Sequence, residues 1–321
     1  MDKKALLADF EHKKYGFVDD ASIQVCEWNK KALRGEGKCY KQDFYGVHCV
    51  SCHQMTPLTF WCNNSCIFCW RPKEYMKTNA PKGAAPKEII EGLIKRRAKL
   101  ISGFGGHEGV PKEKFAEGLE QRHWAISLSG EPTLYKELPK LVRQLKERKG
   151  TETIFIVTNG QNPSMIMKMW KEDSLPTQLY VSMVAPREEL YRKITCNREK
   201  SGWKNYLKSL SSLALLPTRS VIRLTLIKGK NDSPKDIEEF AELLEAVQSD
   251  FVEVKAYMWL GFSRKRLAEE NMPYHEYVKE FAGKLLLKMP SYHLEAEKTD
   301  SRILLLKKNS SKYKTKIIDR D

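Results

Sequence analysis

The sequence predicts an α/β fold built around a parallel sheet. Short apolar segments and longer amphipathic segments alternate six times along the chain, which is the rhythm of βαβ units. The short segments are rich in β-branched and aromatic residues and nearly continuous in apolar character, as strands buried on both faces are. We therefore expect strands at residues 58–62, 124–129, 153–158, 179–184, 221–227 and 251–257.

Amphipathic helices are predicted between these strands. In the last but one, Ser233 is a favourable N-cap and Pro234 occupies the first helical position. The expected helices cover residues 86–101, 134–149, 162–172, 204–216, 233–248 and 274–289. Six alternations imply either a doubly wound sheet or a partial barrel, and periodicity does not separate the two.

The regions on either side of this series differ from it. Residues 1–57 show no sustained periodicity and are rich in Lys, Tyr and Cys, so we expect an N-terminal extension there. The β/α series then occupies residues 58–290, and residues 291–321 form a C-terminal segment with a basic tail. For the tail, residues 304–321, we expect a solvated and partly frayed terminus, with contact to phosphate groups as the alternative.

The composition indicates a globular protein with a basic surface. Of the 321 residues, 41% are hydrophobic and 30% charged. A total of 56 Lys and Arg against 41 Asp and Glu gives a formal net charge of +15, which favours polyanionic partners. Charge alone does not decide this, because thermophile proteins that bind no nucleic acid are also rich in Lys. The sequence has no apolar run that approaches a membrane span and no signal-peptide core, so we expect a cytoplasmic protein without membrane contact.

The cysteine spacing points to a metal site. Seven of the eight cysteines lie within the first 69 residues, and clustered thiols in a reducing cytosol are more often metal ligands than disulfides. Cys62, Cys66 and Cys69 form a C-x3-C-x2-C pattern on one compact loop. A structural zinc site needs four ligands, and Cys52 or His53 could supply the fourth. An iron–sulfur cubane held by three thiolates instead keeps one iron open to a small molecule.

A second pattern stands at the end of the next predicted strand. The segment "SLSGEPTLY" (127–135) contains Gly130, Glu131 and Pro132. Glycine allows close backbone approach, and carbonyl and carboxylate oxygens accept hydrogen bonds from an ammonium group. Because the carboxyl ends of parallel strands share one edge, we expect this turn to lie near the cysteine loop.

Together the two patterns resemble the radical S-adenosylmethionine (SAM) superfamily, including the aromatic Phe68 within the cysteine loop. The resemblance implies a [4Fe–4S] cluster on Cys62, Cys66 and Cys69, whose open iron chelates SAM, and formation of a 5′-deoxyadenosyl radical. It also implies SAM-binding roles for residues at three strand ends, which are Gly130, Glu131, Pro132, Thr158, Asn159 and Ser182.

A longer part of the chain is similar to one branch of that superfamily, the tRNA 4-demethylwyosine synthases in their archaeal, stand-alone form without a flavodoxin-like domain. The similarity includes "GKCYKQDFYGVHCVSCHQMTPLTFWCNNSCIFCWRP" (37–72), "PTQLYVS" (176–182) and "VEVKAYMWLGFSRKRL" (252–267). It implies a partial (β/α)6 TIM-like barrel of the radical SAM type with a cysteine-bearing N-terminal extension.

The same resemblance implies a second cluster and a reactive lysine. Cys26, Cys39 and Cys52 match the ligands of a second [4Fe–4S] cluster, and Cys49 is left as a spare thiol. Lys41 matches a lysine that forms a Schiff base with pyruvate. This chemistry is reasonable, because an amine near a cationic site has a depressed pKa and becomes nucleophilic.

The implied reaction converts N1-methylguanosine at position 37 of tRNA-Phe into 4-demethylwyosine, with SAM and pyruvate, in wybutosine biosynthesis. The electron would come from an external reductant of the flavodoxin or ferredoxin type, and we expect a monomer. For contact with the RNA, we expect the basic run after the sixth strand, Arg264, Lys265 and Arg266.

One departure from the family pattern is Val184, which stands where an acidic residue is usual. Two alternative functions also remain open. The first is another radical SAM enzyme with an auxiliary iron–sulfur cluster, and the second is a non-catalytic zinc-knuckle RNA-binding protein.

Overall fold

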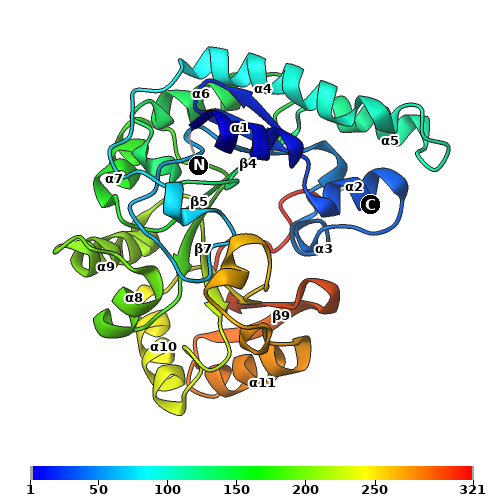
Figure 1. Cartoon of the computed structure of the whole chain (residues 1–321). Helices are drawn as coiled ribbons and strands as arrows, with labels where there is room; N and C mark the ends of the chain where they lie inside the picture. Colours follow the sequence, from blue (N-terminus) through cyan, green and yellow to red (C-terminus); the bar gives the residue numbers. More distant parts are fainter. Residues whose placement is uncertain (1–2, 320–321) are drawn as a thin grey trace.

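The framework of the fold is one ten-stranded sheet, in the order β1-β2-β3-β4-β5-β6-β7-β8-β10-β9 (Figure 1). The computed structural model describes residues 3–319 of the chain. The strands are β1 Tyr15–Val18, β2 Ala21–Gln24, β3 Cys52–Thr56, β4 His123–Ile126, β5 Thr153–Thr158, β6 Gln178–Met183, β7 Arg219–Leu226, β8 Phe251–Ala256, β9 Tyr292–Lys298 and β10 Ile303–Lys308.

The central six strands, β3 to β8, are parallel and adjacent in chain order. A doubly wound sheet reverses its strand order at a switch point, whereas a barrel does not, so the order identifies a partial (β/α)6 barrel. The β1–β2 hairpin adds antiparallel strands to β3, and β10 and β9 add antiparallel strands to β8. The predicted fold class is confirmed.

The helices between the parallel strands cover the outer face of the sheet (Figure 1). Helix α10 begins as predicted, because the Ser233 hydroxyl accepts a hydrogen bond from the Asp236 amide and the Asp236 carboxylate accepts one from the Ser233 amide. The helices are α1 Lys3–His12, α2 Glu27–Arg34, α3 Tyr40–Tyr45, α4 Pro86–Ile101, α5 Lys112–Leu119, α6 Leu138–Glu147, α7 Pro163–Lys171, α8 Glu188–Thr195, α9 Gly202–Ser212, α10 Pro234–Val247 and α11 His275–Leu286.

The first parallel strand lies earlier than predicted. Residues 58–62 form no strand, and Trp61 makes only an isolated bridge with Lys77. Strand β3 is instead Cys52–Thr56, and Pro57, which has no amide hydrogen to donate, follows its end. The apolar character of residues 58–62 reflects burial of the chain as it leaves the sheet, since Leu58 and Phe60 belong to the main core.

The C-terminal segment was also predicted wrongly. Residues 303–308 form β10, which lies inside the sheet between β8 and β9. Beyond it, the Arg219 guanidinium donates to the backbone carbonyl of Thr315 at 2.8 Å, and the Ile317 amide donates to the Tyr45 carbonyl at 3.0 Å. The described part of the tail is therefore packed against β7 and α3 rather than frayed.

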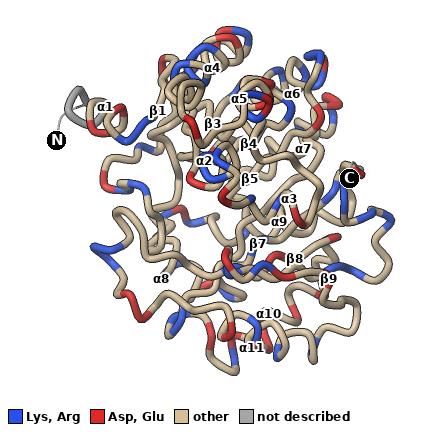
Figure 2. Tube along the Cα trace, turned by 90° about the vertical axis from the view of Figure 1, so that its right-hand side faces the viewer, with Lys and Arg blue, Asp and Glu red and all other residues tan. Residues whose placement is uncertain are grey.

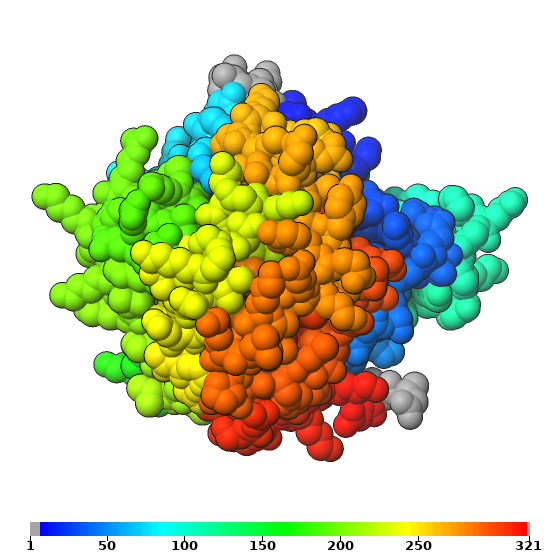
Figure 3. All heavy atoms as spheres, turned by 90° about the horizontal axis from the view of Figure 1, so that it is seen from below, coloured from blue at the N-terminus to red at the C-terminus, as the bar shows by residue number. Residues whose placement is uncertain are grey.

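The N-terminal extension closes the open side of the barrel. Tyr40, Phe44 and Tyr45 of α3 form one core cluster with Phe251 of β8 and with strand β10. In Figure 3 the orange to red C-terminal part of the chain lies beside the blue N-terminal part. An ion pair of 2.8 Å between Asp43 and Lys298 joins the two at the surface. The inner face of β5 to β8 is consequently covered by α3.

Lys and Arg positions are interspersed with Asp and Glu positions along the outer helices (Figure 2). The net charge of +15 is therefore not collected on one helix face. Among the described residues, the helices are all too short or too polar to traverse a lipid bilayer.

Candidate active site

The thiols of Cys62, Cys66 and Cys69 lie together on the loop that follows β3. Burial raises the pKa of all three, that of Cys62 to about 12. The neighbouring thiols Cys62 and Cys69 raise the pKa of Cys66 further, because a thiolate there would be repelled by both. Three thiols that oppose one another's ionisation in this way are arranged for a cation or a cluster.

Backbone bonds from distant elements fix the conformation of this loop. The amides of Ser65 and Ile67 donate to the carbonyls of Thr195 and Ile194 at the end of α8, each at 2.9 Å. Such bonds hold the loop against the barrel independently of any ligand that the thiols bind.

Arg266 also holds the loop. Its guanidinium donates to the carbonyls of Ile67 and Cys69 and forms an ion pair of 2.6 Å with Glu74. Arg266 was expected among the RNA contacts, but its donors are used within the protein. Arg264, which donates to the Trp259 carbonyl at 3.0 Å, and Lys265 remain exposed.

The Gly-Glu-Pro turn lies directly against the start of the cysteine loop. Gly130 has a φ of 67°, and a Cβ atom there would lie 2.1 Å from the Leu58 carbonyl oxygen, so no other residue fits without displacing backbone. The Glu131 amide donates to the Trp61 carbonyl at 2.7 Å. The buried Pro132 then begins a short 3-10 turn. The turn and the loop therefore form one unit.

The Glu131 carboxylate connects the ends of β4 and β5. It accepts hydrogen bonds from the hydroxyls of Thr133 at 2.7 Å and Thr158 at 2.6 Å, and from the Asn159 amide at 2.8 Å. Burial raises the pKa of Glu131, although these donors oppose the shift. The carboxylate is thus a brace within the site, with its oxygens occupied by protein donors.

Asn159 extends this brace to the thiols. Its side-chain nitrogen lies 3.7 Å from the Cys62 sulfur and donates to the Asn63 side chain at 2.7 Å. Ser182 stands one strand further along, opposite Arg223 in the β6–β7 register, and so on the face that α3 covers. Val184 is 3% exposed and packs in the main core.

The three loop thiols fit a cubane. A cubane carries its ligands on separate iron atoms, and the thiols of Cys62, Cys66 and Cys69 lie close enough to influence one another's ionisation. The Asn159 amide facing a thiol is the kind of outer hydrogen bond that cluster sulfurs receive.

A second group of thiols comes from three elements of the extension. Cys26 precedes α2, Cys39 precedes α3, and Cys52 begins β3. Burial raises the pKa of Cys26 to about 12, and the Cys52 and Cys39 thiols add to the shift. Burial likewise raises the pKa of Cys52 to about 11. The structure brings together the three cysteines that the resemblance implied as ligands.

Arg97 of α4 is buried beside this second group. Its guanidinium donates to the carbonyls of Gly118 at 3.0 Å and Val50 at 2.7 Å, yet Nη1 has no hydrogen-bond partner among the described residues. Burial lowers the pKa of Arg97 to about 10, while Cys52 and Cys26 oppose the shift. A buried guanidinium with an unused donor next to thiols fits an anionic cluster. Nothing in the sequence marks Arg97 as a site residue, because it sits in a run of basic residues that is typical of a solvated helix face.

Cys49 lies beside the second group as a fourth thiol. It is 4% exposed, and its sulfur accepts a hydrogen bond from the Cys39 amide at 3.5 Å. Burial raises its pKa to about 12. Its sulfur therefore fixes the backbone at Cys39.

Lys41 projects from α3 into the barrel. Its Nζ lies 4.3 Å from the centre of the Phe155 ring and 5.0 Å from that of Tyr180. Burial lowers the pKa of Lys41, and the nearby Arg223 guanidinium lowers it further. The lysine is thus enclosed by aromatic rings and biased toward its neutral, nucleophilic form.

Three charged side chains on β7 and β8 surround Lys41. Arg223 donates to the fully buried Glu253 at 2.8 Å, and Lys255 donates to the Ser301 carbonyl at 2.9 Å. Burial lowers the pKa of Lys255 to about 8. Beside Lys41, the two strands therefore supply two cations, Arg223 and Lys255, against one carboxylate. Arg223, Glu253 and Lys255 could have been recognised in the sequence as charged residues within otherwise apolar predicted strands.

Family models match the chain in two consecutive parts. The model described as the Radical SAM superfamily matches residues 56–244, and the model described as Wyosine base formation matches residues 246–308. The first covers the cysteine loop and the Gly-Glu-Pro turn.

Curated relatives and solved structures match nearly the whole chain. An S-adenosyl-L-methionine-dependent tRNA 4-demethylwyosine synthase of Pyrococcus abyssi is 45% identical over 92% of this chain and 86% of its own length. The enzyme of the same name from Methanocaldococcus jannaschii is 37% identical over 95% of this chain and 96% of its own length. A structure of TYW1 with a lysine–pyruvate adduct bound aligns with a TM-score of 0.88 at 35% identity, over 98% of this chain and 99% of that one. The chain therefore belongs to the tRNA 4-demethylwyosine synthase family of the radical SAM superfamily.

Proposed function

We propose that this protein converts N1-methylguanosine at position 37 of tRNA-Phe into 4-demethylwyosine, using SAM and pyruvate. The observation that carries the proposal is the position of Lys41 inside the barrel, against the rings of Phe155 and Tyr180 and beside the second thiol group. A maturase that acts on a peptide or cofactor has no need of an amine at this place.

For SAM, we propose that Cys62, Cys66 and Cys69 hold a [4Fe–4S] cluster, which supplies the electron for reductive cleavage of SAM. Gly130, Glu131 and Pro132 then form the amino-group site. Because the Glu131 carboxylate already accepts protein donors, the SAM ammonium is received by backbone carbonyls of this turn. Thr158, Asn159 and Ser182 line the continuation of the site along the strand ends and contact the rest of SAM.

For pyruvate, we propose that Cys26, Cys39 and Cys52 hold a second [4Fe–4S] cluster beside Lys41. The neutral Lys41 amine attacks the pyruvate keto carbon and releases water, which leaves a Schiff base. Arg223 and Lys255 receive the pyruvate carboxylate, because Glu253 alone does not balance these two half-buried cations. The hydrocarbon and aromatic walls given by Phe155 and Tyr180 exclude water from the adduct.

The proposal extends to partners. The substrate is tRNA-Phe carrying N1-methylguanosine, the electron comes from a separate flavodoxin or ferredoxin, and the protein acts as a monomer. The relatives named 4-demethylwyosine synthase support the class of substrate. The solved structure with a lysine–pyruvate adduct supports the use of a lysine and pyruvate.

The direct test is incubation of the anaerobically reconstituted protein with methylated tRNA-Phe, SAM, pyruvate and dithionite, followed by nucleoside mass spectrometry. We expect the tricyclic base, and no such base when pyruvate is omitted or the guanosine is unmethylated. Formation of deoxyadenosine without the tricyclic base would reject the substrate assignment while leaving SAM cleavage intact.

A further inference from the structure

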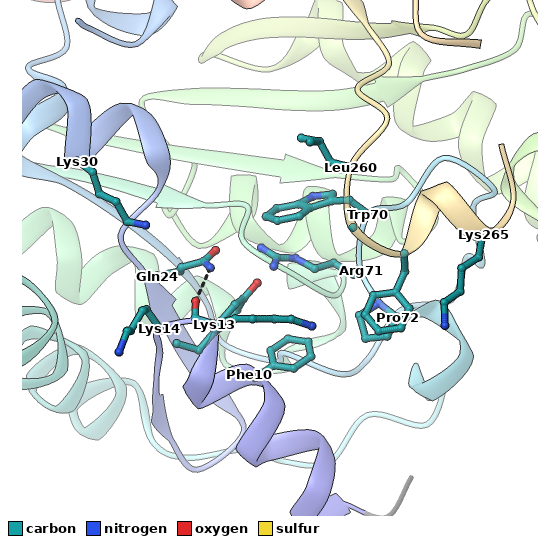
Figure 4. Close-up of a pocket in the computed structure, with 13 residues that line it drawn as sticks. Phe10, Lys13, Lys14, Gln24, Lys30, Trp70, Arg71, Pro72, Leu260 and Lys265 are labelled. Atoms are coloured by element: carbon teal, nitrogen blue, oxygen red, sulfur yellow. Dashed lines mark hydrogen bonds between the residues drawn. The ribbon is translucent and has the colours of Figure 1, made fainter. Parts of the chain in front are cut away.

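A groove with a volume of about 670 Å³ opens beside the cysteine loop (Figure 4). Its walls come from the end of α1 and the β1–β2 hairpin, from the chain just after Cys69, and from the turn around Gly261. Gln24, on one wall, lies two residues before Cys26, and Trp70, on the other, directly follows Cys69. The lining of the groove therefore includes a sequence neighbour of a cysteine from each thiol group.

The charge of the groove is positive throughout. Its cationic lining residues are Lys13, Lys14, Lys30, Arg71 and Lys265, and the described lining contains no aspartate or glutamate. Lys13 and Lys30 each pair with a carboxylate of their own helix region, Asp9 at 2.6 Å and Glu27 at 3.6 Å. Lys14 and Lys265 form no ion pair with any described residue. SAM carries a sulfonium cation and is a poor occupant of such a groove, whereas a polyanion suits it.

Aromatic faces are interleaved with these cations. Trp70 is 43% exposed at the groove, which is unusual for so large an apolar side chain, and the Arg71 guanidinium lies 3.4 Å from its ring centre. In Figure 4 the Trp70 ring lies across the groove between Leu260 and Arg71. Phe262 lies next to Trp70, whose carbonyl accepts a hydrogen bond from the Phe262 amide at 3.0 Å, and Lys13 and Lys265 each lie 5.1 Å from the Phe262 ring. Cations alternating with exposed rings are the arrangement that binds single-stranded nucleic acid, in which phosphates meet lysines and bases stack on rings.

We propose that this groove binds the single-stranded anticodon-loop segment next to the target guanosine, with backbone phosphates at Lys13, Lys14 and Lys265 and one base stacked on Trp70. The inference rests on the proposed function, because it takes the substrate to be a tRNA. A base that reacts must leave its stack, and a flanking base held on Trp70 keeps the strand in place while the target enters between the thiol groups. A protein reductant with an acidic surface is the rival occupant, but a concave groove with stacking faces favours RNA.

The test measures equilibrium binding of methylated tRNA-Phe to the reconstituted full chain at several salt concentrations. Replacing both Lys14 and Lys265 by Ala is expected to weaken binding about 10-fold at low salt. It should also lower the slope of log Kd against log salt by about 1.4, since each lost single-strand phosphate contact removes about 0.7. Trp70→Ala is expected to weaken binding about 10-fold with an unchanged slope, and Trp70→Phe to restore most of the loss, because the ring face remains.

Matched controls lie far from the groove. Lys284→Ala removes an ion pair to the carboxylate four residues earlier, as Lys13→Ala does, but on α11 at the opposite end of the molecule (Figure 1). Trp170→Ala removes a tryptophan that is 37% exposed on α7. We expect Lys13→Ala to weaken binding several-fold and neither control to change it.

The outcomes separate the inference from the proposed function. Parent affinity and parent salt slope in the lysine variants, with iron content unchanged, would overturn the groove assignment even if the parent makes the tricyclic base. Unchanged tRNA affinity with slower reduction by flavodoxin would assign the groove to the reductant and also overturn it. Trp70→Ala could lose iron because Cys69 is adjacent. In that case the lysine variants, which lie outside the cysteine loop, test the groove assignment. A parent that binds tRNA through the groove but forms no tricyclic base would reject the proposed function alone.

Discussion

The two thiol groups are built in opposite ways. Cys62, Cys66 and Cys69 come from one short loop, so their proximity follows from chain connectivity. Cys26, Cys39 and Cys52 come from the starts of α2, α3 and β3, and meet only when the extension has folded onto the barrel. The first group depends on local spacing and the second on tertiary structure. Both groups also lie beside basic side chains, Lys73 and Arg266 at the loop and Lys41 and Arg97 at the second group.

The largest expected effect is a division of iron between the two groups. Cys66→Ala and Cys52→Ala should each remove about four of roughly eight irons per chain, because each group holds one cubane. Only the Cys66 variant should lose SAM cleavage, whereas both should lose the tricyclic base. Iron and sulfide analysis with a deoxyadenosine assay checks this. Loss of all iron in either variant would contradict independent clusters, and zinc in place of iron would favour the zinc-knuckle alternative.

The next effect concerns the cations near the second group. Lys255→Met should raise the KM for pyruvate by roughly 10–100-fold with a smaller change in kcat, because a charge-assisted contact to the carboxylate contributes about 1.5–3 kcal/mol. Steady-state kinetics with varied pyruvate measures this. Lys279→Met removes an exposed lysine paired with Glu297 and serves as the control. An unchanged KM in the Lys255 variant would exclude Lys255 from pyruvate binding.

Arg97→Met tests whether the second group depends on its buried cation. Removing a positive charge disfavours the reduced, more negative cluster, so the reduction potential of the second cluster should fall by tens of millivolts. The rate of product formation should fall about 10-fold. Two hydrogen bonds to Gly118 and Val50 are lost too, so the melting temperature should fall by several degrees. Redox titration followed by electron paramagnetic resonance measures the change in reduction potential separately from the change in melting temperature. If the reduction potential of the loop cluster changed instead, Arg97 would act on the loop thiols and its assignment to the second thiol group would be wrong.

Asn159→Ala is the counterpart at the loop and should have the smallest effect. It removes a weak contact of 3.7 Å to the Cys62 sulfur and the side-chain hydrogen bonds with Asn63 and the Gln161 amide. The Glu131 carboxylate still holds the Asn159 backbone amide. The rate of SAM cleavage should fall by at most about 10-fold, which is a small effect for the loss of a hydrogen bond to a cluster ligand. The potential of the second cluster should stay unchanged, and a change there would show that the two groups are coupled.

Much of the fold could be predicted from the sequence. Strands β4 to β8 have apolar runs bounded by turn residues, and α10 has its N-cap at Ser233. Strand β3 was missed because "CHQMT" is polar, while the apolar run at residues 58–62 is a buried loop. Strand β10 was missed because its apolar residues run into a lysine-rich tail, and only the free edge of β8 makes them a strand.

The site divides in the same way. The loop thiols and the Gly-Glu-Pro turn are visible as local motifs, whereas the pairing of Arg223 with Glu253 depends on the register between β7 and β8. The buried Arg97 and the interior position of Lys41 depend on how the extension packs, which no local pattern encodes.

Lys41 is the residue assigned to bind pyruvate beside the second thiol group, and the function proposed for this protein requires that bond. Borohydride reduction of the reconstituted protein with pyruvate, followed by peptide mass mapping, measures this without requiring turnover. We expect one reduced pyruvate per chain on the peptide that contains Lys41, and none in Lys41→Arg. Labelling at Lys255 or another lysine, or no labelling of the parent protein, would contradict the account.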